Sequence, residues 1–385
     1  MQDFSFYNPT RIEFGAGKIA TLAQLVPANA QVLVLFGGES ARRTGTLDEV
    51  TTALGEREVQ LFGGIEPNPS FETLMEAVAV VRNNDIDFLL AVGGGSVIDG
   101  TKFVAAAALF EGDTWDILLQ GGQNIERALP FGSVLTLPAT GSEMNKGSVI
   151  TRKALQAKLP FMSEWVYPRF SVLDPVKTYT LPARQVANGV VDAFVHVMEQ
   201  YLTYPAQAPV QDRFAEGLLH TLIEIGPRAL AEPEDYQTRA SLMWTATLAL
   251  NGLIGAGVPQ DWATHMLGHE LTALHGLDHA QTLAIVLPEM LRRRKATKLG
   301  KLVQYAERVW NIREGSDDDK AEAAIEHTRA FFESVGVKTR LGDYSLNATH
   351  IDGIIDSLQR HGMVALGEHG DVTPEHCRQI LLASL

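Results

Sequence analysis

The sequence contains a single cysteine, Cys377, among 385 residues. One thiol cannot form an intrachain disulfide or a cluster of thiolate metal ligands, which favours a reducing compartment. The chain also lacks any run of about 18 apolar residues, and residues 1–10 lack the basic and apolar regions of a signal peptide. We therefore expect a cytoplasmic protein that is neither secreted nor embedded in a membrane.

Positive charge is scarce, because 32 Lys and Arg residues stand against 46 Asp and Glu residues and leave a formal net charge of −14. Such a chain repels phosphate backbones and anionic lipids, which argues against nucleic acids and membrane surfaces as partners. Hydrophobic residues make up 45% and charged residues 20% of the sequence, so a sizeable core can form. A small neutral substrate fits this composition better than a polyanion does.

Short apolar runs alternate with amphipathic segments of helix length in the first half of the chain. The runs predicted as buried strands are Gln31–Phe36, Asp87–Val92, Ser133–Leu137 and Phe170–Leu173. This alternation is typical of a parallel sheet whose strands are joined by helices. After Pro182 the β-branched runs become rare, and Ala, Leu, Glu and Arg recur at helical spacing.

The chain is longer than one hydrophobic core usually supports, so we expect two domains. The change of pattern near Pro182 places the boundary between them. We predict an α/β domain with a parallel sheet at residues 1–180 and an all-α domain at residues 181–385.

A glycine-rich segment follows the second predicted strand. Gly94, Gly95 and Ser96 precede a helix expected to begin near Val97, so their backbone N–H groups can approach a pyrophosphate at the positive end of that helix. A tight turn also requires glycine, which is the structural alternative. Asp99 could bind a nicotinamide amide or favour the helix dipole, and spacing does not separate the two.

The first predicted strand is followed by Gly37, Gly38 and Ser40. The pattern G-x-G-x-x-G with a later acidic residue is absent, so we expect a doubly wound sheet other than the standard Rossmann fold. Ser40 and the guanidinium groups of Arg42 and Arg43 could hold an adenosine 2′-phosphate, which favours NADP(H).

Glu39, in the same segment, has the opposite effect. A carboxylate near the ribose prefers two free hydroxyls and repels a phosphate, so the use of NAD(H) stays open. The alternative for Arg42 and Arg43 is a solvated helix face without a ligand.

Hydroxyl side chains mark the end of the third predicted strand. Thr136, Thr140 and Ser142 stand where open α/β sheets bind ligands, which makes them candidates for lining the cofactor. An ordinary strand-to-helix turn capped by Ser142 would explain the same residues, and their chemistry alone favours neither reading.

A potential metal site combines one acidic side chain with histidines. Asp192 and His196 are four residues apart in a helical pattern, so both project from one face and can share an ion. Four of the eleven histidines fall within fifteen positions: His265, His269, His275 and His279. One carboxylate with three imidazoles suits Fe²⁺ or Zn²⁺ and leaves a position for a substrate oxygen. The H-E-x-x-H pattern of zinc proteases is absent, which makes hydrolysis the secondary hypothesis.

Five stretches together resemble the iron-containing (group III) alcohol dehydrogenases, whose fold is dehydroquinate-synthase-like. These stretches are FGGIEPNP (Phe62–Pro69), AVGGGSVIDGTK (Ala91–Lys102), LTLPATGSE (Leu135–Glu143), NGVVDAFVHVMEQY (Asn188–Tyr201) and GVPQDWATHMLGHELTALHGLDHAQTLAIVLP (Gly257–Pro288). The resemblance covers nearly the whole chain, and the last stretch is highly specific. Within the family the sequence is similar to the butanol dehydrogenase branch of broad aldehyde reductases that use NADPH.

The resemblance implies roles for individual residues. The metal would be held by Asp192, His196, His265 and His279. The catalytic residue beside the nicotinamide ring would be His269. Contacts to the pyrophosphate or nicotinamide would come from Gly94, Gly95, Ser96 and Asp99, and the cofactor would be lined by Thr136, Thr140 and Ser142. Lys158 matches a family lysine at the cofactor ribose. Glu39 departs from the NADPH-using branch, where a glycine is typical, and the family suggests a homodimer.

These features predict a metal-dependent alcohol dehydrogenase or aldehyde reductase that transfers hydride between NADP(H) and small aliphatic aldehydes or alcohols. The first domain would bind the dinucleotide, and the second would bind the metal and the substrate. His269, or water acting through the ribose hydroxyls, would supply the proton.

Three alternatives stay open. A polyol or glycerol dehydrogenase would share the cofactor and the metal. A dehydroquinate-synthase-type lyase would need more Lys and Arg around an anionic substrate. A metallohydrolase or a simple metal-binding protein would make the glycine segment purely structural.

Overall fold

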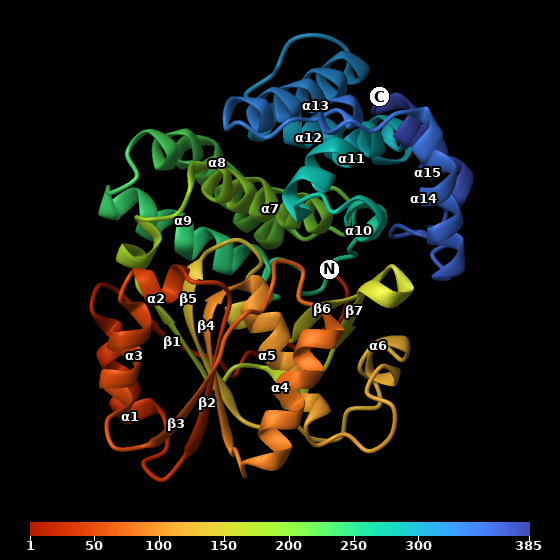
Figure 1. The fold of residues 1–385 in the computed structure, drawn as a ribbon. Helices are drawn as coiled ribbons and strands as arrows, with labels where there is room; N and C mark the ends of the chain where they lie inside the picture. Colours follow the sequence, from red (N-terminus) through yellow and green to blue (C-terminus); the bar gives the residue numbers. More distant parts are fainter. The chain divides into compact units, whose positions relative to one another are not determined.

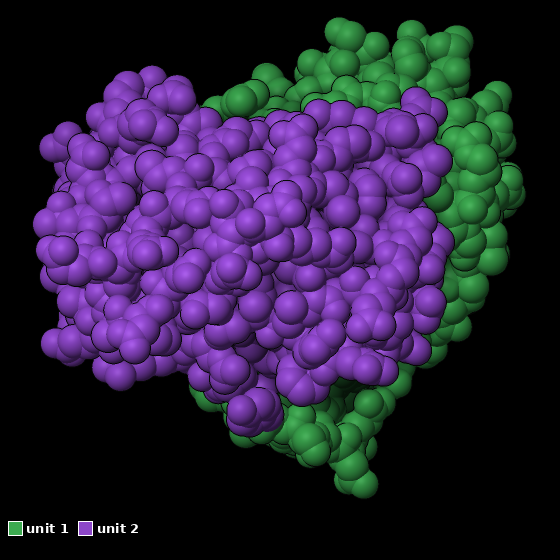
Figure 2. Space-filling view, turned by 60° about the horizontal axis from the view of Figure 1, so that its bottom comes forward, with its two compact units in different colours: residues 1–6, 182–232, 248–385 green, residues 7–181, 233–247 purple.

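The computed structural model describes residues 1–385, which divide into two compact units. Unit 2 contains Tyr7–Leu181 and Pro233–Thr247, and unit 1 contains Met1–Phe6, Pro182–Glu232 and Leu248–Leu385 (Figure 2). The predicted boundary lies between residues 180 and 181, whereas unit 2 runs to Leu181, leaves out Met1–Phe6 and includes Pro233–Thr247. Which unit such a short segment joins depends on its tertiary contacts, and the local sequence pattern does not predict these contacts.

Unit 2 is built on a six-stranded parallel sheet in the order β1-β8-β5-β4-β2-β3 (Figure 1). Its strands are β1 (Arg11–Phe14), β2 (Gln31–Phe36), β3 (Glu58–Phe62), β4 (Phe88–Gly94), β5 (Phe131–Leu137) and β8 (Phe170–Leu173). A separate antiparallel hairpin consists of β6 (Gly147–Arg152) and β7 (Ala157–Met162). The four predicted strands all form. The pattern does not predict β1 and β3, because both are edge strands of mixed exposure without a continuous apolar run.

Helices cover both faces of this sheet (Figure 1). The helices of this part are α1 (Leu22–Leu25), α2 (Ser40–Arg43), α3 (Thr46–Leu54), α4 (Phe71–Asn83), α5 (Gly95–Ala107) and α6 (Asp116–Leu119), of which α6 packs against β7 of the hairpin. Leu33 and Leu35 of β2 belong to one core with residues of α4 and α5, whereas Val32 and Val34 belong to another with residues of α1 and α3. Because alternate strand residues point to opposite faces, burial on both sides makes these strands continuous apolar runs.

The predicted glycine loop is not a separate element. β4 continues through Gly94 and α5 begins at Gly95, two residues before the predicted start at Val97. A Cβ on Gly93 would collide with the side chain of Val97, and a Cβ on Gly95 would collide with that of Thr140. The strand passes directly into the helix because these two positions carry no side chain.

Unit 1 is helical, as the pattern after Pro182 predicts. Its helices are α7 (Ala183–Tyr201), α8 (Pro209–Ala231), α10 (Ala263–His275), α11 (His279–Arg293), α12 (Lys295–Arg308), α13 (Asp317–Ser334), α14 (Ala348–Arg360) and α15 (Pro374–Ala383), while α9 (Tyr236–Ala249) lies mostly in unit 2. Every residue of α7 from Gly189 to Tyr201 is buried, and α11 packs against α7, α10, α13 and α15. None of the helices combines the length and the apolar character that a membrane span requires.

Phe194 of α7 is fully buried, and its ring centroid lies 5.3 Å from that of Phe331 and 5.4 Å from that of Phe332. Phe194→Ala is expected to lower the free energy of unfolding of unit 1 by about 3–5 kcal/mol, because it removes buried apolar area and leaves a cavity. Urea denaturation followed by circular dichroism measures this change. Phe214→Ala on α8 is the control, since Phe214 is 48% exposed and its loss should cost less than about 1 kcal/mol. Equal losses in the two variants would contradict the assigned core.

Candidate active site

The predicted metal ligands come from three helices of unit 1. Asp192 and His196 lie on α7, His265 lies on α10, and His279 is the first residue of α11. One ligand atom from each of Asp192, His265 and His279 lies within 4.8 Å of the others. Asp192 Oδ1 lies 3.8 Å from His196 Nε2 and 3.6 Å from His279 Nε2. The fold therefore brings three of the four potential ligands within reach of one ion, and the His196 ring lies beside them, stacked on that of His265 with 4.7 Å between centroids.

This donor set fits a divalent ion. Asp192, His196 and His265 are at most 5% exposed. Burial lowers the pKa of His196 to about 4, although Asp192 acts in the opposite direction, so this imidazole is neutral at pH 7 and has a nitrogen lone pair to offer. A carboxylate with imidazoles is a mixed oxygen and nitrogen set, which suits Fe²⁺ or Zn²⁺.

Glu199 of α7 belongs to the same cluster, although no motif pointed to it. One of its carboxylate oxygens contacts His265 Nδ1, and the other accepts a hydrogen bond from the Thr264 N–H at 2.7 Å. Burial and the nearby Asp261 raise the pKa of Glu199, so its ionised form depends on positive charge close by. The sequence signal was its position seven residues after Asp192, which puts both side chains on one face of the helix.

The clustered histidines have different surroundings. His269 lies one turn after His265 on α10 and is 3% exposed. Its ring centroid lies 5.3 Å from that of His279 and 6.4 Å from that of His265. His275 packs instead beside His350, with 5.3 Å between ring centroids. His269 is thus the histidine that neighbours the potential ligands.

The predicted cofactor residues lie in unit 2, at the carboxyl ends of three strands. They are Gly37, Gly38 and Ser40 after β2, Gly94, Gly95 and Ser96 at the junction of β4 and α5, and Thr136, Thr140 and Ser142 at and after the end of β5. β2, β4 and β5 are adjacent and parallel, so their carboxyl ends share one edge of the sheet. Open α/β sheets bind ligands at this edge, and the N-terminus of the 13-residue helix α5 lies there without a side-chain cap, so its first N–H groups have no partner within the helix.

Asp99 connects this edge to the neighbouring hairpin. Its Oδ1 accepts a hydrogen bond from Ser142 Oγ at 2.5 Å, and its Oδ2 accepts one from the Val149 N–H at 2.9 Å. Both carboxylate oxygens therefore bind the chain itself, which braces the segment around Ser142 against α5. Contact between Asp99 and a nicotinamide stays a prediction.

Lys158 of β7 reaches the glycine segment through Asn68. Lys158 Nζ donates to Asn68 Oδ1 at 2.8 Å, and the Asn68 N–H donates to Ser96 Oγ at 3.3 Å. Asn68 has a φ of 56°, in the left-handed region that asparagine tolerates better than most residues. From the sequence, Asn68 before Pro69 is a plausible N-cap of the next helix, but Ser70 caps α4 instead, and the contact with Lys158 was not predicted.

Glu39 and Arg42 pair with each other after β2. Glu39 Oε2 lies 3.5 Å from Arg42 Nε, and their side chains are 77% and 56% exposed. The Arg42 guanidinium also lies over the ring of Phe36, 5.5 Å from its centroid. Because so exposed a pair is worth only about 0–1 kcal/mol, a phosphate group could displace Glu39 from Arg42 at little cost.

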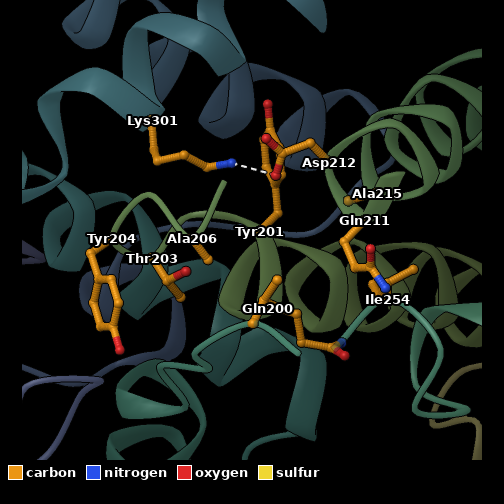
Figure 3. Close-up of a pocket in the computed structure, with 11 residues that line it drawn as sticks. Gln200, Tyr201, Thr203, Tyr204, Ala206, Gln211, Asp212, Ala215, Ile254 and Lys301 are labelled. Carbon is orange, nitrogen blue, oxygen red and sulfur yellow. Dashed lines mark hydrogen bonds and ion pairs between the residues drawn. The ribbon is translucent and has the colours of Figure 1, made fainter. Parts of the chain in front are cut away.

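Two cavities within the units contain none of the predicted site residues. The cavity in unit 1 has a volume of about 10 Å³, room for a single water molecule, and Lys301 pairs with Asp212 at 2.7 Å on its wall (Figure 3). The second, in unit 2, has a volume of about 280 Å³ and is lined in part by Met162 and Trp165. The histidine cluster and the sheet edge therefore remain the candidate sites.

Two family models together match most of the chain. The model described as iron-containing alcohol dehydrogenase matches residues 9–175. The model described as Fe-containing alcohol dehydrogenase family, C-terminal, matches residues 186–385. The two matches correspond to the sheet-bearing part and the helical part of the sequence.

Full-length relatives agree with these matches. The chain is 61% identical over 386 residues to the NADPH-dependent aldehyde reductase YqhD of Escherichia coli, and the match covers 100% of both chains. It is 41% identical to probable NADH-dependent butanol dehydrogenase 1 of Bacillus subtilis, again over 100% of both. The crystal structure of NADH-dependent butanol dehydrogenase A from Thermotoga maritima superimposes with a TM-score of 0.95 at 34% identity, covering 100% of this chain and 99% of that one.

His265→Ala is expected to lower the affinity for a divalent metal by more than about tenfold, because one buried imidazole ligand is lost. Elemental analysis after dialysis measures the retained metal. His220→Ala is the matched control, since the His220 ring is bonded to the backbone oxygen of Arg308 and touches none of the proposed ligands. Full metal retention by the His265 variant would remove His265 from the ligand set.

Proposed function

The chain belongs to the iron-containing alcohol dehydrogenase family, and on that basis we propose that it reduces small aliphatic aldehydes with NADPH and a divalent metal. Oxidation of the corresponding alcohols is the reverse reaction. Support comes from the 61% identity, over the full length of both chains, to a protein named as an NADPH-dependent aldehyde reductase. The structural observation that carries the proposal is the cluster of Asp192, His265 and His279, because these three side chains could hold a divalent ion that polarises the substrate carbonyl.

When bound, the divalent ion would polarise the carbonyl oxygen of the substrate, and NADPH would supply the hydride. Asp192, His196, His265 and His279 would hold that ion in unit 1. Asp192 is the only negatively charged ligand of the four, so a divalent ion together with its ligands would keep a net positive charge. That positive charge would favour the negative charge that develops on the aldehyde oxygen during reduction.

The groups that would bind the dinucleotide belong to unit 2. The N–H groups of Gly95 and Ser96, at the N-terminus of α5, would bind the pyrophosphate, because a helix N-terminus attracts anions. Thr136, Thr140 and Ser142 would line the cofactor. Lys158, which Asn68 already orients, would reach the ribose.

His269 would donate the proton that converts the reduced substrate into an alcohol. Its burial beside His279 places the imidazole next to the proposed ligands and away from bulk water. No other histidine of the sequence cluster combines these features outside the ligand set.

The alternatives have less support. A polyol or glycerol dehydrogenase would use similar groups, but the relatives at 61% and 41% identity are named for aldehydes and for butanol. A metallohydrolase would not need the residues gathered at the carboxyl edge of the sheet.

We also propose that the enzyme works in the cytoplasm as a homodimer. The cytoplasm suits a chain whose single cysteine, Cys377, is buried and free. The dimer rests on the resemblance to the family, in which a closed two-fold assembly is expected.

A single assay tests the metal, the cofactor and the reaction together. We expect the protein to oxidise NADPH in the presence of butyraldehyde, to lose this activity after chelation, and to regain it when Fe²⁺ or Zn²⁺ is supplied. Absorbance at the NADPH band measures the rate. Undiminished turnover by protein shown to be metal-free would contradict the proposal, as would a lack of turnover by metal-loaded protein.

Glu39→Gln is expected to raise the ratio of kcat/KM for NADPH to that for NADH by roughly fivefold, which corresponds to about 1 kcal/mol for an exposed charge interaction. The substitution removes a negative charge near the proposed 2′-phosphate position and frees Arg42. Steady-state kinetics with both cofactors measures the ratio. Glu56→Gln, also on the exposed surface of unit 2, should leave it unchanged. An unchanged ratio in the Glu39 variant would place Glu39 away from the cofactor.

A further inference from the structure

We infer that Glu199 is a positioning residue that fixes the proton and the orientation of His265 for metal binding. The inference rests on the proposed function, because that function assigns His265 as a ligand. Glu199 itself is not a ligand in that assignment, and the family resemblance gave it no role.

The contacts of Glu199 are directed at the start of α10. Its side chain is buried, and its two carboxylate oxygens contact His265 Nδ1 and the Thr264 N–H. Thr264 belongs to the first turn of the helix, where backbone N–H groups have no partner within the helix. Trp262, at the N-cap position, makes no side-chain hydrogen bond to the N–H groups of this turn. Glu199 thus holds the His265 ring and the backbone beside it together.

This arrangement selects one tautomer of His265. When positive charge such as a bound divalent ion keeps Glu199 ionised, its carboxylate only accepts hydrogen bonds, so the Nδ1 atom that faces it carries the proton. The lone pair of the imidazole is then on Nε2, which is the nitrogen that can face an ion. Carboxylates that orient metal-binding histidines in this way raise the basicity of the ligand.

A buried ionic cluster fixes the position of Glu199 relative to the start of α10. The Asp261 N–H donates to the backbone oxygen of Glu199 at 2.9 Å, and Asp261 Oδ2 accepts from Lys298 Nζ at 2.6 Å. Lys298 also donates to the oxygens of Leu202 and Glu368, and its side chain is only 1% exposed. The end of α7 and the turn before α10 are therefore tied to one lysine.

Two rings limit the remaining freedom of His265. The His196 ring stacks on it with 4.7 Å between centroids, and the Trp262 ring approaches edge-on at 5.2 Å. Trp262 has a φ of 64°, which is unusual for a bulky residue and persists only when its surroundings hold it. Asp261 stabilises this conformation, because it accepts hydrogen bonds from both Lys298 and the Ala263 N–H.

The substitution Glu199→Gln tests whether Glu199 orients His265 or only fills space beside it. The amide has the same shape, and its oxygen still accepts from the Thr264 N–H. Its NH₂ group then faces His265 Nδ1 and donates to it, which moves the imidazole proton to Nε2 and removes the lone pair from the metal side. We expect the dissociation constant for Zn²⁺ to rise by about 10–100-fold while the melting temperature stays near that of the wild type.

The experiment uses the full-length protein loaded with Zn²⁺ and titrates it with a chromophoric chelator, which yields the dissociation constant without any turnover. Visible absorption of the Co²⁺-substituted protein reports on ligand geometry, and the Glu199 variant should show an altered band. Glu199→Asp, which keeps the charge on a shorter side chain, should recover part of the affinity.

Glu216→Gln is the matched control. Glu216 is also a buried carboxylate of unit 1, but it accepts from Tyr201 and Gln304 and touches no histidine. We expect this control to bind Zn²⁺ like the wild type. Wild-type affinity in the Glu199→Gln variant would overturn the inference, and so would an equal loss in the Glu216 control. Failure of the proposed function is distinguishable, because it would appear as absent NADPH turnover by the metal-loaded wild type.

Discussion

The gathering of one carboxylate and several imidazoles in the core of unit 1 is the constraint on which the rest of the site depends. Burial of Asp192 is costly unless positive charge or hydrogen-bond donors surround it. Helices α7, α10 and α11 bring His196, His265 and His279 to that carboxylate, and a divalent ion would balance its charge. The same burial keeps His196 neutral and able to coordinate.

The sheet of unit 2 meets a different requirement, which is to present backbone N–H groups to an anion. Parallel strands place their carboxyl ends along one edge, and the direct passage from β4 into α5 at Gly94 and Gly95 leaves the helix N-terminus at that edge. Hydrogen bonds within the unit hold the surrounding segments in place, as Asp99 does with Ser142 and Lys158 does with Asn68. A preformed site of this kind reduces the conformational entropy that ligand binding must offset.

Membership of the iron-containing alcohol dehydrogenases connects these two requirements, since a metal-dependent reduction of an aldehyde uses a hydride donor together with a Lewis acid. Two further features of this chain bear on the site. Glu39 adds a negative charge near the proposed phosphate position, where it pairs with Arg42. Glu199 contacts His265 directly, and Lys298 holds the turn before α10 through Asp261. The orientation of His265 therefore depends on the tertiary fold and not on the other ligands alone.

By itself the sequence determined the four strands buried on both faces, the change to helices after Pro182 and the residue types of the metal site, because continuous apolar runs and i, i+4 spacing are local properties. Only the tertiary structure decided which groups meet across long separations. Glu199 and His265 are 66 residues apart, and Lys158 and Asn68 are 90 apart. Edge strand β3 and the packing of Pro233–Thr247 with unit 2 depend on neighbours in the same way. Spacing along the chain contains no information on such contacts, because they arise from the packing of separate elements.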